Sequence, residues 1–312
     1  MSMIQYLLRR LLFVLVTMLA VSALAYGLIF ASGDPALMLA PRRPGAEPEP
    51  RMVEAVRKRY NLDKPLPIQY LTYLSHVLRG DLGNSYYYHR PVSELLFEKF
   101  PNTLLLAVLI MITALVIGLP LGMLAAIQRN TILDRFIIAA CTLMIAVPAF
   151  FLALMLVYLI GFRMRLLPLS GHGTLQHLIL PVLSVALPTA AGYVIFLRTN
   201  VLNQVSAEYA RTARAKGLTA MRTAIKHVLP NALIPVVTLA SLDFAYLLTG
   251  IVLVESVFNY PGIGLQVLQA VNNRDVPVVM GSVFMAAILI GVGNLIADLV
   301  VARLDPRIRL GS

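Results

Sequence analysis

Six long apolar runs constrain this chain more than any other feature of its sequence. A helix needs roughly 20 apolar residues to cross the hydrocarbon core of a bilayer, and each run reaches that length with at most one charged residue inside it. The runs cover residues 11–33, 103–130, 136–162, 166–197, 228–254 and 276–297. Only 13% of the residues are charged and 59% are hydrophobic, so the chain lacks the charge that a water-exposed surface needs. We therefore predict an all-α membrane protein with six transmembrane helices.

The runs divide the chain into three parts. Residues 1–32 form the first transmembrane helix, residues 33–101 an extracytoplasmic segment, and residues 102–312 the remaining transmembrane domain. In the long segment, apolar residues recur at helical spacing over 52–60 and 68–78, which predicts two short amphipathic helices. A cleaved signal peptide is the alternative for the amino terminus, but the apolar run continues to Ala31, which favours a retained span.

The basic residues predict the orientation of the six helices. If the amino terminus is cytoplasmic, thirteen Lys and Arg residues lie in the cytoplasmic pieces and three in the short outer loops. The other ten lie in the long outer segment, and segments of that length largely escape the positive-inside rule. We therefore expect both termini to lie in the cytoplasm. The net charge of +11 then needs no nucleic-acid partner to explain it.

The sequence lacks the motifs of an enzyme. No G-x-x-x-x-G-K-[ST] phosphate-binding loop is present, so we expect no ATP bound by this chain. The single cysteine, Cys141, and the scattered histidines offer no set of metal ligands. We expect neither a cofactor nor a catalytic site, and the remaining function classes are transport and binding.

One basic stretch between the fourth and fifth apolar runs, residues 206–230, has the pattern of a folded loop. Ser206 is suited to cap a helix, Gly217 to end it in the left-handed region, and Thr219 to cap a second helix. Pro230, after Leu229, is expected to stop that second helix. The small residues at 213 and 217 predict a shallow face for a protein partner. The alternative is a loop that only lies on anionic lipid.

This stretch, "EYARTARAKGLTAMRTAIKHVLPNA" (208–232), resembles the EAA loop of permease subunits of ABC importers. Arg211-Thr212-Ala213 replaces the usual Glu-Ala-Ala and His227 a usual aliphatic residue, as in the dipeptide and oligopeptide branch. Further motifs of that branch follow one another over roughly residues 4–310. They are "YLLRRLL", "SGDPA" (32–36), "LDKPLPIQY" (62–70), "GDLGNS" (80–85), "FNYPGIG" (258–264), "RDVPVV" (274–279) and "LDPRIR" (304–309).

The resemblance implies a B-type permease of the bacterial inner membrane that works with a related C-type permease, two ATPase subunits and an extracytoplasmic binding protein. ATP and Mg²⁺ would be bound by the ATPases, and the loop would couple them to the membrane domain. The coupling residues so implied are Glu208, Arg211, Thr212, Ala213, Arg214, Lys216, Gly217, Leu229 and Pro230. The expected cargo is di- or oligopeptides, although related permeases carry nickel, glutathione, haem or oligosaccharides.

Asp243 lies in the middle of the fifth apolar run, where a charged side chain is costly and therefore a functional candidate. We expect it to face a hydrated translocation path. It departs from the neutral residue usual in the resembling family. The alternative function is a secondary transporter that uses Asp243 as a proton or ion site, without any ATPase.

Overall fold

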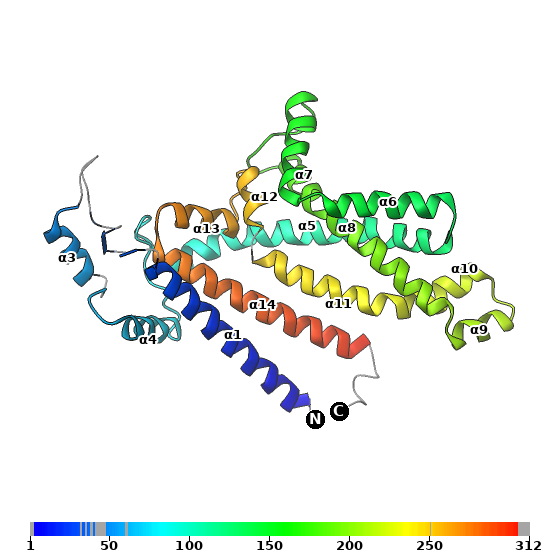
Figure 1. The fold of residues 1–312 in the computed structure, drawn as a ribbon, viewed down its shortest axis with the longest axis horizontal. Helices are drawn as coiled ribbons and strands as arrows, with labels where there is room; N and C mark the ends of the chain where they lie inside the picture. The colour runs from blue at the N-terminus through cyan, green and yellow to red at the C-terminus, as the bar shows by residue number, and fades with distance from the viewer. Residues whose placement is uncertain are drawn as a thin grey trace. The chain divides into compact units, whose positions relative to one another are not determined.

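The computed structural model describes residues 3–31, 33–34, 36–37, 40, 48–59, 62–249 and 251–304. Helices make up nearly all of the regular structure in these ranges, with one isolated β-bridge between Asn84 and Pro91. The helices, drawn in Figure 1, are α1 (Met3–Ala31), α3 (Pro50–Arg59), α4 (Leu66–Val77), α5 (Val92–Ile127), α6 (Ile132–Ala146), α7 (Ala149–Leu156), η1 (Val157–Arg163), α8 (Gln176–Val205), α9 (Glu208–Ala215), α10 (Ala220–Thr223), η2 (Ala224–Val228), α11 (Leu229–Leu248), α12 (Val252–Val257), α13 (Ile263–Asn272) and α14 (Val276–Leu304). The two η elements are π-helical.

Several helices are long and apolar enough to cross a bilayer. Within the described ranges these are Val92–Ile127, Gln176–Val205, Ala220–Leu248 and Val276–Ile296. A fifth crossing results if the bent pair Ile132–Ala146 and Ala149–Arg163 counts as one span. The 29-residue α1 contains residues 11–31 of the first apolar run. The all-helical, multi-span class is thus confirmed, and the number six stays a prediction.

The third apolar run, predicted as one span, forms two helices that are separated by a sharp bend. Its two halves meet at an angle of 97°. Val147 is extended (φ −83°, ψ 120°) and Pro148 follows as the residue before α7. The proline ring disfavours the helical region for the residue before it, which explains the break.

The fourth predicted span is displaced toward the carboxyl end. Helix α8 begins only at Gln176, ten residues after the apolar run begins, and continues to Val205. The intervening chain turns at Gly171 and Gly173, both with φ +106°. The Gly171 N–H donates to the carbonyl of Phe258 over 2.8 Å. Hydrophobicity alone did not reveal this ordered connection.

The chain divides into two compact units, the first of which comprises Met1–Asn102 and Gly262–Gly291. The two amphipathic helices predicted in its long segment are confirmed as α3 and α4. The Tyr26 hydroxyl of α1 donates to Gln69 Oε1 of α4 over 3.0 Å, and the hydroxyls of Ser22 and Tyr70 lie 2.8 Å apart. These polar contacts attach α4 to α1. Most of the proline-rich stretch 41–50 lies outside the described residues.

A buried carboxylate joins two distant motifs of the first unit. Asp275, fully buried, accepts hydrogen bonds from Ser85 Oγ (2.5 Å), Tyr86 N (3.1 Å) and Tyr87 N (3.2 Å). The "GDLGNS" and "RDVPVV" motifs are therefore joined by the hydrogen bonds of the Asp275 carboxylate. These hydrogen bonds satisfy the buried carboxylate and its three donors, as burial of polar groups requires.

The second unit comprises Thr103–Pro261 and Val292–Ser312. Helix α8 is its centre: α6, α7 and α11 all pack against it, and many of its side chains are buried. Two glycines of α5 permit a close crossing with α8. A Cβ added at Gly118 would lie 2.9 Å from Tyr193 Cβ, and one added at Gly122 would lie 2.9 Å from the Val194 carbonyl oxygen. Small residues play this role generally where membrane helices cross closely.

Candidate functional site

The basic loop 206–230 folds as two helical segments joined by an elbow, as predicted. The first segment is α9, preceded by Ala207 in an extended conformation, without a side-chain cap. Ser206 ends α8 instead, and its hydroxyl donates to the Asn203 carbonyl over 2.8 Å. The prediction of a Ser206 cap on α9 is therefore wrong. Helix α8 continues further than the apolar run, so Ser206 falls at its carboxyl end.

Gly217 forms the elbow with φ +87°. Its N–H donates to the Arg214 carbonyl over 2.9 Å, and the N–H of Leu218 donates to the Ala213 carbonyl over 3.3 Å. These two bonds define a Schellman motif, which ends a helix and needs a left-handed residue at this position. The predicted conformation of Gly217 is thus confirmed.

The second segment begins at Thr219, whose hydroxyl accepts from the Arg222 N–H over 3.3 Å. This predicted cap is confirmed. The predicted stop at Pro230 is wrong, because α10, η2 and α11 follow one another without a break from Ala220 to Leu248. Pro230 is the second residue of α11 and directly follows the π-helical segment and Leu229. The π-helical turn before it shifts the hydrogen-bond register at the junction.

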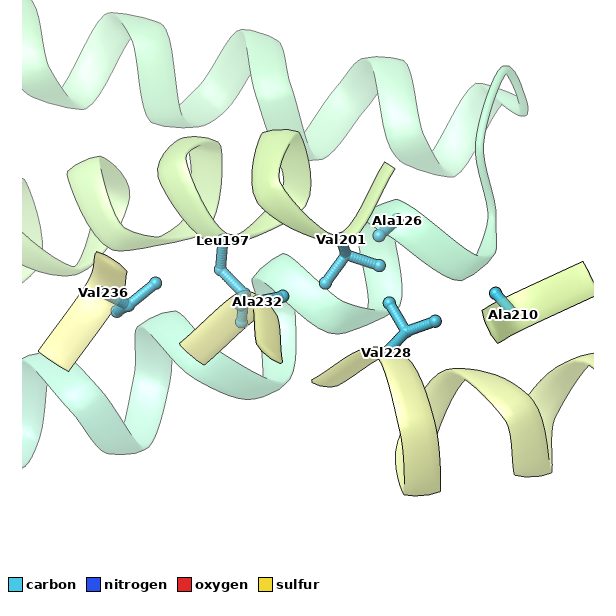
Figure 2. Close-up of a cluster of buried hydrophobic side chains, with 7 residues drawn as sticks. All are labelled: Ala126, Leu197, Val201, Ala210, Val228, Ala232 and Val236. Carbon is cyan, nitrogen blue, oxygen red and sulfur yellow. The ribbon is translucent and has the colours of Figure 1, made fainter. Parts of the chain in front are cut away.

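A buried apolar cluster anchors the loop to the long helices, and Figure 2 shows its side chains. Its members come from α5, α8, α9, η2 and α11, and they are Ala126, Leu197, Val201, Ala210, Val228, Ala232 and Val236. Leu229 packs against the cluster. Ala213 is buried as well, with 7% of its surface exposed. Ala213 therefore does not contribute to an exposed docking face, contrary to our prediction, because the small face of α9 turns inward.

The charged face of α9 points to solvent. Glu208, Arg211, Thr212, Lys216 and Gly217 are exposed. Arg214 differs from its neighbours: its guanidinium donates to the carbonyls of Val205 (2.9 Å) and Ala210 (3.3 Å). Arg214 therefore caps the end of α8, where a positive charge also suits the helix dipole.

Tyr209 adds a contact at the base of the loop. Its hydroxyl donates to Gln204 Oε1 of α8 over 2.7 Å. Burial raises the pKa of the Tyr209 phenol, although a hydrogen bond with Asn231 opposes that rise. The loop is thus held to α8 by both apolar and polar contacts.

Asp243 lies half-buried in α11 and has a specific partner. Tyr193 of α8, itself buried, donates its hydroxyl to Asp243 Oδ2 over 2.7 Å. The Tyr193 oxygen also lies 3.5 Å from the sulfur of Met111 in α5. Asp243 adjoins an open face of α11 on which Leu242 and Tyr246 are exposed. A charged residue there is held in place by one hydrogen bond and remains accessible from one side.

Two family models match the chain over almost its whole length. The model described as "Binding-protein-dependent transport system inner membrane component" matches residues 118–310, and the model of the corresponding amino-terminal region matches residues 3–107. The chain belongs to this family. It is a permease subunit of an ABC importer, of the dipeptide and oligopeptide type.

The permease is similar to curated relatives over almost its whole length. It is 37% identical to the glutathione transport system permease protein GsiC of Salmonella typhimurium (strain LT2) over 308 residues, covering 98% of this chain and 99% of the relative. The protein of the same name from Escherichia coli (strain K12) is 36% identical over the same length.

Solved structures share the fold of the permease. One is the MetNI methionine ABC transporter in an inward-facing conformation, with a TM-score of 0.58 and 21% identity over 68% of this chain and 96% of that chain. Another is an amino acid ABC transporter with histidines, with a TM-score of 0.52 and 17% identity over 69% and 94% of the two chains. At these identities the likeness concerns the fold alone.

Sequence reasoning missed two partners in the permease. The first is Tyr193, the partner of Asp243, which gave no signal because it is one of several large side chains in an apolar run. The second is the ion pair in which Arg198 of α8 donates to both carboxylate oxygens of Asp134 in α6, each over 2.7 Å. Both residues are charged and lie close to predicted helix ends, which marks each of them as a candidate for an ion pair. Their separation of 64 residues along the chain gave no reason to pair them.

Proposed function

We propose that this permease forms, with a second related permease, the translocation path of an ATP-driven importer for short peptides. Two ATPase subunits would bind ATP and Mg²⁺ on the cytoplasmic side, and an extracytoplasmic binding protein would deliver the cargo. The single observation that carries the proposal is the loop 206–230: it is a helix–glycine–helix unit whose charged face is exposed and whose small face is fixed to the transmembrane helices.

The loop has the construction that a mechanical coupling element needs. Its exposed residues are available to an ATPase surface, whereas Ala210 and Val228 pack with Leu197 of α8 and Val236 of α11 in one cluster. Tightly packed interiors transmit displacement rather than absorb it. A movement imposed on the exposed side would therefore reach α8 and α11, and these helices would move between inward-open and outward-open states.

The proposed orientation follows from the charge distribution. Six predicted spans, with thirteen basic residues on the cytoplasmic side and three in short outer loops, would put both termini and the loop 206–230 in the cytoplasm. In this orientation residues 33–101 are extracytoplasmic and face the binding protein. Surrounding lipid is the remaining partner.

Short peptides are the proposed cargo, with glutathione as the first to test. The permease is similar over almost the full length of the GsiC relatives, which are named as glutathione permeases, and glutathione is a tripeptide. Nickel, haem and oligosaccharides are the cargoes that the wider family adds.

Asp243 is the proposed path residue. Its carboxylate, held by Tyr193, would meet the ammonium group of a peptide where the open face of α11 borders the path. An ion-coupled transporter is the competing function for the same residue, and it would work without an ATPase.

Uptake in reconstituted vesicles tests the proposal. The permease, its partner permease, the ATPases and the loaded binding protein are assembled, and uptake of labelled glutathione is measured with and without ATP. An excess of unlabelled di- to hexapeptides then competes. We expect uptake that requires ATP and is inhibited by peptides.

Two variants separate coupling from cargo. Arg211→Glu reverses an exposed charge on α9 and is expected to reduce ATP-driven uptake. Arg163→Glu is the matched control, since Arg163 is exposed outside the loop, and should leave uptake unchanged. If glutathione and peptides stay outside while another ligand on the binding protein still stimulates ATP hydrolysis, the cargo is wrong and the architecture stands. Uptake driven by a proton gradient without ATPases would refute the importer itself.

A further inference from the structure

A cavity with charged residues in its lining lies at the turn that joins α5 to α6 in the second unit. Its volume is about 340 Å³. Its lining consists of Asn130, Asp134, Arg135, Ile138, Ala139 and Arg198. The turn directly follows α5, which is long and apolar enough to cross a bilayer, so we place the turn at the membrane surface.

The ion pair between Asp134 and Arg198 forms one wall of this cavity. Both oxygens of Asp134 accept from Arg198, and Oδ2 also accepts from the backbone N–H of Asn130 over 2.9 Å. The Asp134 side chain is only 3% exposed. The guanidinium carries five N–H donors, and Asp134 occupies two of them. The pair therefore fixes the guanidinium in place while the other donors remain available to a ligand.

Arg135 makes the cavity cationic. It is exposed, and no ion pair of Arg135 is found within the described part of the chain. With two arginines and one aspartate, the lining has a net charge of +1. Planar guanidinium groups bind phosphate with paired hydrogen bonds. The chemistry of the cavity is therefore that of a phosphate site.

The surface beside the cavity is apolar. On α6, Phe136 and Leu143 are each 71% exposed. They are seven residues apart, so the apolar face extends about 10 Å along the helix from the cavity toward the bilayer interior. Ala139, which lines the cavity, is three residues from Phe136 and joins this face to the cavity. A cationic site beside a long apolar surface matches a phospholipid, which has an anionic phosphate and apolar acyl chains in one molecule.

We propose that this cavity is a binding site for an anionic phospholipid. Arg135 and Arg198 bind its phosphate, and its acyl chains lie along the exposed face of α6. An acidic protein segment would satisfy the arginines but would not cover Phe136 and Leu143 at membrane depth. The site is separate from the coupling loop and from Asp243, and it is independent of the cargo.

Native mass spectrometry of the complete transporter tests this site. The detergent-purified complex is stripped of lipid and titrated with phosphatidylglycerol or phosphatidylcholine of the same acyl chains. The tested variant is Arg135→Gln, and the control is Arg129→Gln, a nearby exposed arginine that does not line the cavity. We expect preferential retention of phosphatidylglycerol. Arg135→Gln should weaken it about fivefold, the effect of one cation at a membrane surface, and Arg129→Gln should not.

Two further measurements identify the occupant. Inorganic phosphate should not compete at concentrations that far exceed those of the lipid, since it lacks acyl chains; equal competition would mean a free-anion site and overturn the proposal. A photoreactive lipid analogue should label peptides that contain 132–145, whereas cross-linking of Ala139→Cys to another subunit in the intact complex would show a protein in its place. Equal retention of both lipids, or unchanged retention in Arg135→Gln with an unchanged melting temperature, would also refute it.

Discussion

Replacement of Gly217 by alanine tests whether the elbow of the loop 206–230 depends on backbone conformation alone. Gly217 has φ +87°, and a Cβ added there would meet no heavy atom within 4 Å. The substitution therefore introduces no clash. Its cost is the left-handed conformation itself, about 1–2 kcal/mol for a residue with a side chain.

This cost should appear as local opening of the elbow, because the loop is at the surface and the cluster beneath it is untouched. Two amides report on the Schellman motif, those of Gly217 and Leu218. A change of about 1.4 kcal/mol corresponds to a factor of ten. Hydrogen exchange at these amides should thus become about ten times faster in Gly217→Ala. Gly217→Asn should show a smaller effect, since asparagine tolerates this region better.

Gly173 provides the matched control. It has φ +106° and likewise no heavy atom within 4 Å of an added Cβ, but it lies in the connection before α8. Gly173→Ala should accelerate exchange around residue 173 and leave the Gly217 and Leu218 amides unchanged. Unaltered exchange in Gly217→Ala, or equal acceleration of the loop amides in both variants, would refute the reasoning.

Three further predictions concern other parts of the fold. Asp275→Asn weakens a buried acceptor of three hydrogen bonds and should lower the free energy of unfolding by about 2–3 kcal/mol, measured by denaturation in detergent; the same change at the exposed Asp63 should cost almost nothing. Gly118→Ala forces a Cβ to within 2.9 Å of Tyr193 and should cost about 1–3 kcal/mol, whereas Gly192→Ala, with no atom within 4 Å, should not destabilise; equal melting temperatures would contradict this. Hydrogen bonds from the Gly83 amide and His76 hold the pKa of Asp81 below its usual 3.8, so the stabilisation that ionised Asp81 gives the folded state is complete above pH 3.8 and is lost as the pH falls through the lower, folded-state pKa. The protection of the Gly83 amide against hydrogen exchange, corrected for intrinsic exchange, should fall over the same pH range. Protection that does not change with acid would refute this prediction.

Local chemistry made the loop 206–230 the most predictable part of the molecule. Gly217 and Thr219 act through backbone geometry and a cap that involve only near neighbours, and both predictions are confirmed. The apolar runs likewise predicted a multi-span helical protein, because the bilayer imposes a length on each helix.

Predictions failed where packing decides between equally good local solutions. Ser206 was suited to cap a helix, but α8 extends to reach it. Pro230 was suited to end a helix, but a π-helical turn accommodates it. The inward direction of Ala213 depends on the position of α8, which no short stretch of sequence encodes. The partners of Asp243 and Asp134 are distant along the chain and required the fold.

The central claim is that loop 206–230 docks an ATPase, and cross-linking measures this directly. Cys141 is the one cysteine in the sequence and is buried, so a cysteine introduced by Lys216→Cys is the accessible thiol of this chain. In the assembled complex with a bifunctional thiol reagent, we predict a cross-link from position 216 to an ATPase subunit whose yield changes with ATP, and none from Arg163→Cys. An assembled, transport-competent complex in which position 216 cross-links to no ATPase in any nucleotide state would contradict the account.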